Sequence, residues 1–148
     1  MKELVFALEF RGHAAPVPGS DKRLRAKTSA AGQTLRSLMK PEGIQASIEP
    51  AAGESASCES EVEMVGEGMF VESGNIRYGA AGKVSFRTVG RGTLGASPVD
   101  GTQRGAVVWE VTGGDGCLAG AHGLITSNFT VNAQGEVVDD QFARLFVP

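Results

Sequence analysis

The sequence has few of the side chains that most often carry metal or redox chemistry. Its 148 residues include only two histidines and two cysteines. Cys117 and His122 are four residues apart, but no second pair of ligands accompanies them to complete a tetrahedral zinc site. No G-x-S-x-G nucleophile motif occurs either. We therefore expect neither a metal nor any other cofactor.

Long apolar runs and an excess of basic residues are also missing. No stretch approaches the roughly 18 apolar residues of a membrane span, and Glu9 and Arg11 interrupt the N-terminal apolar run, which argues against an export signal. The formal net charge of −3 argues against nucleic acid as a partner, because phosphate binding needs a sustained basic surface. We expect a soluble cytoplasmic protein without a membrane partner, in which Cys58 and Cys117 are free thiols.

Glycine, in contrast, is abundant, with 21 residues spread along the chain without a period. Turn-rich glycine segments separate short runs in which apolar and polar residues alternate, which is the pattern of β-strands. The expected strands include Glu3–Arg11, Met69–Glu72, Asn75–Tyr78, Lys83–Leu94, Ala106–Thr112, Leu124–Asn132 and Glu136–Val147. Gly32–Lys40 is the only segment whose apolar residues fall at helical spacing.

Sequential strands joined by short turns pair antiparallel, and closing such a sheet removes its exposed edges. The sequence therefore predicts an all-β fold in one domain over residues 1–148, a closed antiparallel β-barrel of about eight strands with at most one short helix. A sandwich of two sheets is the alternative.

Two charged stripes predict a pair of neighbouring strands. Basic residues alternate over 23–27 (Arg23, Arg25, Lys27), and acidic residues alternate over 59–63 (Glu59, Glu61, Glu63). Spacing of two places each stripe on one face of a strand. If the two strands are adjacent, the stripes form cross-strand ion pairs on a solvated outer face. This interpretation is favoured over an anion site because the net charge is acidic.

A glycine-rich segment in the second half carries two possible interpretations. Gly114–Ala119 fits the dinucleotide pattern G-x-G-x-x-G/A, but glycines and β-branched residues follow it where that motif needs a helix. A turn between two strands is therefore favoured. The longer segment Gly113–Phe129 (GGDGCLAGAHGLITSNF) resembles the GGTGxFAGAxG signature of allene oxide cyclase-like (calycin-like) barrel proteins.

That resemblance implies an eight-stranded antiparallel barrel, a mostly apolar cavity for a small apolar molecule, and a homo-oligomer. Some members of the group are cyclases or isomerases. The N-terminal half has no motif that aligns with the group, so the resemblance assigns no catalytic residue.

Hairpin geometry predicts one row of polar side chains across adjacent strands. Arg87 is expected opposite Glu110, Glu110 opposite Asn128, and Asn128 opposite Asp140, with Arg144 on the same face. If this face points into the barrel, Glu110 is the general acid or base with Arg87 beside it, and the others bind substrate. If it points outward, the row is an ordinary surface ladder.

Two aromatic residues complete the candidate site. Tyr78 and Trp109 can stack on a ligand, although both residue types are more often core or rim residues.

Three functions remain open at this point. The first is a cofactor-independent cyclase, isomerase or lyase that acts on a small apolar molecule; the second is a non-catalytic carrier of such a molecule; the third is a structural oligomer with a filled barrel. The first two functions are distinguished by which face of the Ala106–Thr112 strand points into the barrel. Glu110 inside favours the enzyme, whereas Val107, Trp109 and Val111 inside favour the carrier.

Overall fold

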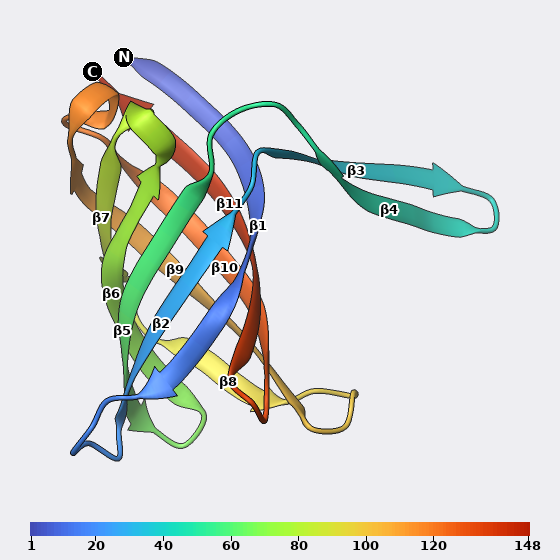
Figure 1. The fold of residues 1–148 in the computed structure, drawn as a ribbon, viewed down its shortest axis with the longest axis vertical. Helices are drawn as coiled ribbons and strands as arrows, with labels where there is room; N and C mark the ends of the chain where they lie inside the picture. The colour runs from blue at the N-terminus through green and yellow to red at the C-terminus, as the bar shows by residue number, and fades with distance from the viewer.

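The computed structural model describes residues 1–148 and consists almost entirely of β-strands (Figure 1). The strands are β1 (Lys2–Pro16), β2 (Arg23–Ala30), β3 (Gln33–Lys40), β4 (Gly43–Pro50), β5 (Ala56–Gly66), β6 (Met69–Tyr78), β7 (Lys83–Thr88), β8 (Gly92–Ala96), β9 (Thr102–Gly114), β10 (His122–Asn132) and β11 (Glu136–Val147). Two short 3-10 turns, η1 (Gly79–Ala81) and η2 (Gly116–Leu118), are the only helical segments. No helix is long and apolar enough to cross a membrane.

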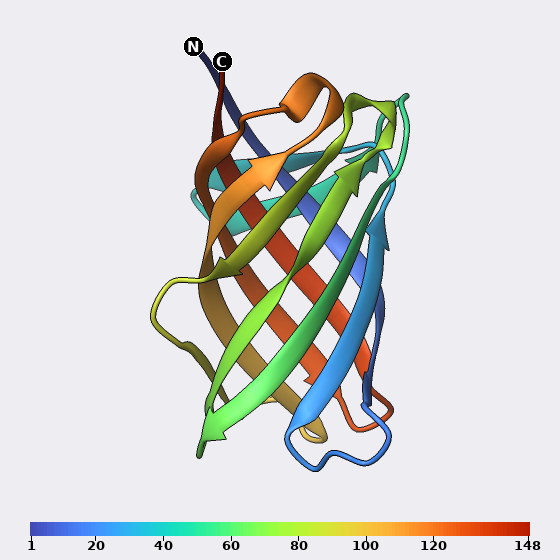
Figure 2. The same cartoon turned by 90° about the vertical axis from the view of Figure 1, so that its left-hand side faces the viewer.

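Nine of the strands form one antiparallel sheet that closes on itself. The order around the sheet is β10-β11-β1-β2-β5-β6-β7-β9-β8, and the additional pairing of β9 with β10 closes the ring. Because β7 and β8 both lie between β6 and β9, they share one position, and the barrel has eight strands around its circumference. The near and far walls of this barrel are visible in Figure 2. The predicted all-β, closed antiparallel barrel is confirmed.

The register between β2 and β5 confirms the predicted charge ladder. Arg23 pairs with Glu63 and Lys27 with Glu59, with Arg25 opposite Glu61 between them. The closest ion pair of this ladder joins Arg23 Nη1 to Glu61 Oε1 at 3.2 Å, and both side chains are about half exposed. The ladder therefore lies on the outer wall, where such pairs contribute little to stability and screen readily in salt.

The segment that carried a helical pattern is a strand, so that expectation is wrong. Gln33–Lys40 forms β3, which pairs with β4 in a separate two-stranded hairpin. Figure 1 shows this hairpin projecting from the barrel between β2 and β5. Its residues also satisfy a period of two, and pairing with the following eight residues supplies the backbone hydrogen bonds that an isolated short helix would lack.

Two predicted strand boundaries also differ from the structure. Ser73 and Gly74, expected to form a turn, lie inside the single strand β6. A Cβ atom on Gly74 would lie 2.1 Å from the carbonyl oxygen of Glu59 on β5. Glycine is therefore required there for close approach of two backbones rather than for a reversal. Conversely, the predicted strand Lys83–Leu94 is interrupted at 89–91, where β7 ends and β8 begins.

The two ends of the barrel differ in how they are filled. The end that carries both chain termini, η1 and η2 is packed with apolar side chains. These include Ile76, Val84, Phe86, Val111, Leu118, Ala121 and Leu145, all buried. Phe86 stacks on Trp109 with ring centroids 4.0 Å apart, and Trp109 ends this core near the middle of the barrel. Beyond Trp109 the interior is not filled.

Candidate functional site

The unfilled half of the barrel holds a cavity of about 400 Å³, within the usual size range of small-molecule sites. Its mouth lies at the end of the barrel formed by the β1–β2, β5–β6 and β10–β11 connections, and its inner end is Trp109. Fourteen of the 25 lining residues are hydrophobic. Phe70 and Phe129 meet edge to face near the mouth, with centroids 5.9 Å apart. The cavity therefore suits a largely apolar molecule.

Two carboxyl groups enter this apolar cavity, each hydrogen-bonded to a serine on the neighbouring strand. Ser60 Oγ on β5 donates to Glu72 Oε2 on β6 at 2.5 Å, and Ser127 Oγ on β10 donates to Asp139 Oδ1 on β11 at 2.6 Å. In both hairpins the serine and the carboxyl residue are diagonal neighbours across the strand pair, offset by two residues from the direct pairing. Diagonal neighbours in an antiparallel pair are within reach of side chains of this length.

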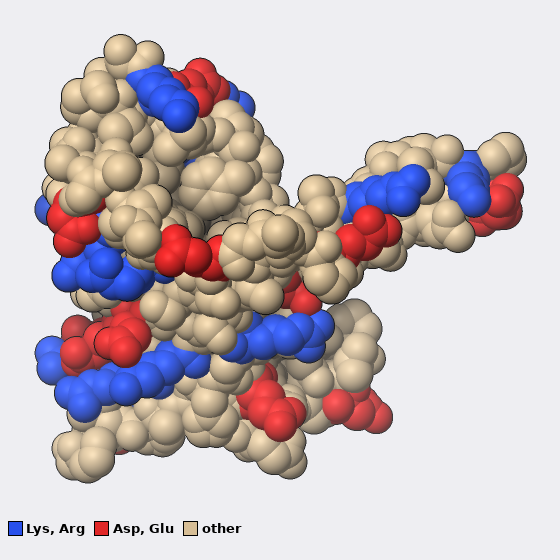
Figure 3. Space-filling model, turned by 45° about the horizontal axis from the view of Figure 1, so that its top comes forward, with Lys and Arg blue, Asp and Glu red and all other residues tan.

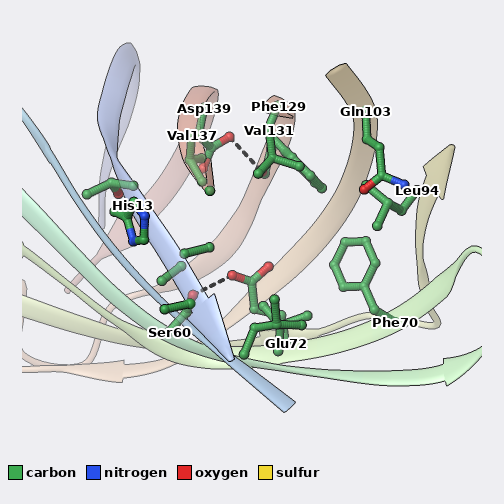
Figure 4. A pocket seen from close by; sticks show the side chains of 18 of the residues that line it. His13, Ser60, Phe70, Glu72, Leu94, Gln103, Phe129, Val131, Val137 and Asp139 are labelled. Atoms are coloured by element: carbon green, nitrogen blue, oxygen red, sulfur yellow. Dashed lines mark hydrogen bonds between the residues drawn. The ribbon is translucent and has the colours of Figure 1, made fainter. Parts of the chain in front are cut away.

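The two serine–carboxyl pairs face each other across the barrel. Counting around the closed sheet, β6 and β11 are four positions apart in a ring of eight, so they lie on opposite walls. Figure 4 shows Glu72 and Asp139 directed into the same pocket from these two walls. Asp139 is only 7% exposed. A ligand at the inner end of the cavity would therefore lie between two carboxyl groups.

Thr88, at the point where β7 ends, holds the backbone of Glu72 in place. At the end of β7, Thr88 Oγ1 accepts a hydrogen bond from Glu72 N at 2.7 Å and donates one to Glu72 O at 2.8 Å. The threonine hydroxyl thus replaces the two ladder hydrogen bonds that a continuous strand would make there. The break between β7 and β8 therefore leaves the backbone N–H and C=O of Glu72 hydrogen-bonded.

Burial raises the pKa of both carboxyl groups toward neutral pH. Desolvation, opposed by the Ser60 hydrogen bond and aided by the negative charge of Asp139, raises the pKa of Glu72 to about 7. Desolvation also raises the pKa of Asp139 to about 6, against the hydrogen bonds from Ser127 and Gln141. Each group can therefore gain or lose a proton between about pH 5 and 8, as a general acid or base must.

Trp109 places an indole N–H beside the Glu72 carboxyl without a hydrogen bond of normal length and angle to it. The side chain is 1% exposed, and its Nε1–H has no hydrogen-bond partner. It nevertheless lies near enough to the Glu72 carboxyl to lower the pKa of that group. A buried N–H without a partner is costly, and an acceptor oxygen on a ligand would satisfy it.

The face of β9 decides where the predicted catalytic residues lie. Arg87 and Glu110 are directly opposite each other, as expected, and their side chains meet at 2.5 Å. Both are on the outer wall, with side chains 69% and 40% exposed. The inward positions of β9 are the buried Val107, Trp109 and Val111. A catalytic role for Arg87 and Glu110 required their face of the sheet to point into the barrel. That face points outward, so the requirement is not met.

The remaining predicted residues are divided between the outer wall and the interior. Asn128 pairs with Asp140 as expected, but Glu110 pairs with Leu124 rather than Asn128, so no continuous polar row forms. Asn128, Asp140 and Arg144 are exposed on the outside. Tyr78 points inward but packs edge to face on Phe6 at 5.2 Å, away from the cavity. Of the predicted site residues, only Trp109 lines the cavity.

Glu72 and Asp139 were missed for two different reasons. Dividing β6 at Ser73 and Gly74 hid the continuous inward face on which Glu72 lies between Phe70 and Ile76. The sequence signal for Glu72 was a carboxyl residue at a position where the alternation of β6 places apolar side chains such as Phe70 and Ile76. In β11 both faces carry apolar residues, and the side with the two phenylalanines is the outer one. Nothing in the alternation alone selects the face of Asp139.

No family model, curated protein or solved structure matches this chain. The eight-stranded closed antiparallel barrel is compatible with a calycin-like fold.

Proposed function

We propose that this protein binds a small, largely apolar molecule inside the barrel and catalyses proton transfer on it without a cofactor, as an isomerase, cyclase or lyase would. The observation that carries the proposal is the pair of carboxyl groups, Glu72 and Asp139, on opposite walls of one apolar cavity. The likeness of Gly113–Phe129 to allene oxide cyclase-like barrels supports the same class of chemistry.

The two carboxyl groups have complementary roles in this proposal. Asp139, with the lower pKa, is the carboxylate that removes a proton from the ligand, and Glu72, with the higher pKa, is the acid that donates one to another atom. In an isomerisation the ligand loses one proton and gains one, so its composition is unchanged. Proton exchange with water then restores both groups. The Trp109 N–H stabilises negative charge that develops on a ligand oxygen.

An assay of proton transfer tests the proposal. Small β,γ-unsaturated ketones are offered as substrates, and conversion to the conjugated isomer is followed by ultraviolet absorbance. We expect a bell-shaped dependence of kcat/KM on pH, with limbs near 6 and 7. Glu72→Gln and Asp139→Asn should each lower kcat by about 10²–10⁴-fold.

Glu110→Gln is the matched control because Glu110 is a carboxyl group on the outer wall. It should leave the rate unchanged. Loss of activity in Glu110→Gln with full activity in Glu72→Gln would overturn the assignment and restore Glu110 as the acid–base residue.

The inward face of β9, formed by Val107, Trp109 and Val111, favours a second candidate function. This is a carrier that binds the same class of molecule without converting it. Trp109 is the only tryptophan and lines the cavity, so its fluorescence reports occupancy directly. Quenching of Trp109 by ligands that undergo no proton exchange with deuterated solvent at any pH would select the carrier and exclude catalysis.

A further inference from the structure

The projecting β3–β4 hairpin has one apolar face and one polar face. Leu35 is directly opposite Ile48, and Met39 is directly opposite Ile44, with Ser37 and Ala46 between these pairs. These six residues, which we call the arm face, alternate with the positions of Arg36 and Lys40 on the other side. Met39 and Ile44 are 75% and 73% exposed. Nothing within the chain covers the arm face.

An uncovered two-stranded hairpin is only marginally stable in water. This one contacts the barrel mainly where β3 begins, through hydrogen bonds between the Gln33 side chain and the Glu9 backbone. Figure 3 shows it standing clear of the barrel, with a few charged side chains among uncharged ones. A surface that buries the arm face would therefore stabilise the hairpin.

The barrel wall carries a second uncovered apolar surface, which begins on β1, the neighbour of β2, and continues around the barrel away from the hairpin. It crosses β9, β10, β11 and β1 and consists of two adjacent rows of outward side chains. We call this surface the wall patch; its members are Val5, Ala7, Val108, Leu124, Thr126 and Phe142. Leu124 is 52% exposed and Phe142 48%. Arg144, which pairs with Glu3, and Glu110, which pairs with Arg87, flank Leu124 within one row. The other row, Ala7, Phe142, Thr126 and Val108, contains no charged side chain. Apolar side chains bordered by charged ones are typical of a protein interface.

We propose that the protein forms a symmetric dimer in which the arm face of each chain packs on the wall patch of the other. The dimensions of the two surfaces agree. The two apolar pairs of the arm are four residues apart, about 13 Å along the strand, and the wall patch crosses four strands, about 14 Å. The hairpin projects away from the barrel (Figure 1), so the arm face can reach a wall patch only on a second copy.

The buried area reaches the lower bound for a specific interface. A hairpin with eight-residue strands is about 26 Å long and about 10 Å wide, so one face covers about 260 Å². Reciprocal packing buries two arm faces and two wall patches, a total of about 1,000 Å². This equals the lower limit expected of a specific interface, whereas a single arm on a wall would bury half as much. The reciprocal arrangement is also the usual symmetry of homodimers.

Sedimentation velocity over a concentration series tests the proposal. We expect the wild-type chain to sediment as a dimer at micromolar concentration. Ile44→Asp on the arm face and Phe142→Asp in the uncharged row of the wall patch should each raise the dimer dissociation constant at least about tenfold, because each places a charge among apolar side chains. Leu38→Asp, on the other face of the hairpin, and Val65→Asp, on β5 across the barrel from β10, are the matched controls and should leave the constant unchanged. A monomeric wild type, or equal weakening by the controls, overturns the proposal.

Cross-linking identifies which surfaces meet. Ile44→Cys and Leu124→Cys are made separately in a Cys117→Ser background, since Cys58 is buried, and the second variant carries a mass tag. The two are mixed and treated with a short bismaleimide. We expect mixed products, in which position 44 of one chain is joined to position 124 of the other. Products that join only two copies of one variant would mean that arm packs on arm, or wall on wall, and would overturn the proposal.

Discussion

At the scale of single residues, Glu72 and Asp139 depart most from what folding alone favours. Burial in an apolar interior destabilises the charged form of a carboxyl group. Glu72 accepts a hydrogen bond from Ser60, Asp139 accepts from Ser127 and Gln141, and neither has a basic partner. Perturbed carboxyl groups in a cavity are typical of functional sites. Their cost in stability can be measured separately from any activity.

The pH dependence of stability follows from the raised pKa values. Both carboxyl groups hold their protons more tightly in the folded protein than in the unfolded chain. Their favourable contribution is therefore complete below about pH 4 and is lost as the pH rises to about 7. Glu72→Gln removes the larger part, so we expect the variant to exceed the wild type in free energy of unfolding by roughly 1–3 kcal/mol at pH 8 and to match it near pH 4.

Urea unfolding at several pH values, followed by Trp109 fluorescence, measures this difference. Glu110→Gln is the control and should show no such pH-dependent gain. A Glu72→Gln variant less stable than the wild type at pH 8 would show that the Glu72 carboxyl is not destabilised by burial.

At the scale of elements, the strands follow from alternation, and their irregularities shape the site. The charge ladder between β2 and β5 could be predicted because opposite charges at a spacing of two specify both neighbours and register. The course of β6 could not, because Ser73-Gly74 has the composition of a turn. Only the approach of β5 explains a glycine in the middle of that strand.

Gly74 gives a test at this scale. Its added Cβ would meet the backbone of β5 at 2.1 Å, so we expect Gly74→Ala to lower the free energy of unfolding by about 1–3 kcal/mol. At Gly66, an added Cβ meets only the flexible end of Met69, at 3.1 Å, so Gly66→Ala should change stability by less than about 1 kcal/mol. Thermal unfolding of the two variants side by side measures the contrast. Equal effects would argue against a close β5–β6 approach.

At the scale of the whole molecule, the hairpin and the barrel are separate sheets, because neither β3 nor β4 pairs with a barrel strand. Ala30 pairs with Ala56 below the hairpin, and Ala51 N donates to Gly32 O at 2.9 Å across its base. Removing the hairpin therefore leaves the β2–β5 ladder intact and joins the two strands by a shorter loop, at no added cost in chain entropy.

Deletion of residues 33–50 is the corresponding test. We expect the shortened chain to keep the β-sheet circular dichroism of the barrel and the response of Trp109 to cavity ligands, and to sediment as a monomer. Loss of the Trp109 response would show that the hairpin supports the cavity, and a persistent dimer would show that the interface lies elsewhere.

The amino-acid sequence alone determined the all-β class, the closed barrel, most strand positions and the β2–β5 ladder, because these depend on local alternation, turn residues and charge spacing. The tertiary structure decided which face of each strand is inside. In β9 and β11 both faces carry apolar side chains, and closure of the ring turned Trp109 and Asp139 inward and Glu110 and Phe142 outward. Inward and outward positions differ by one residue along a strand, whereas the curvature that selects between them belongs to all eight strands together.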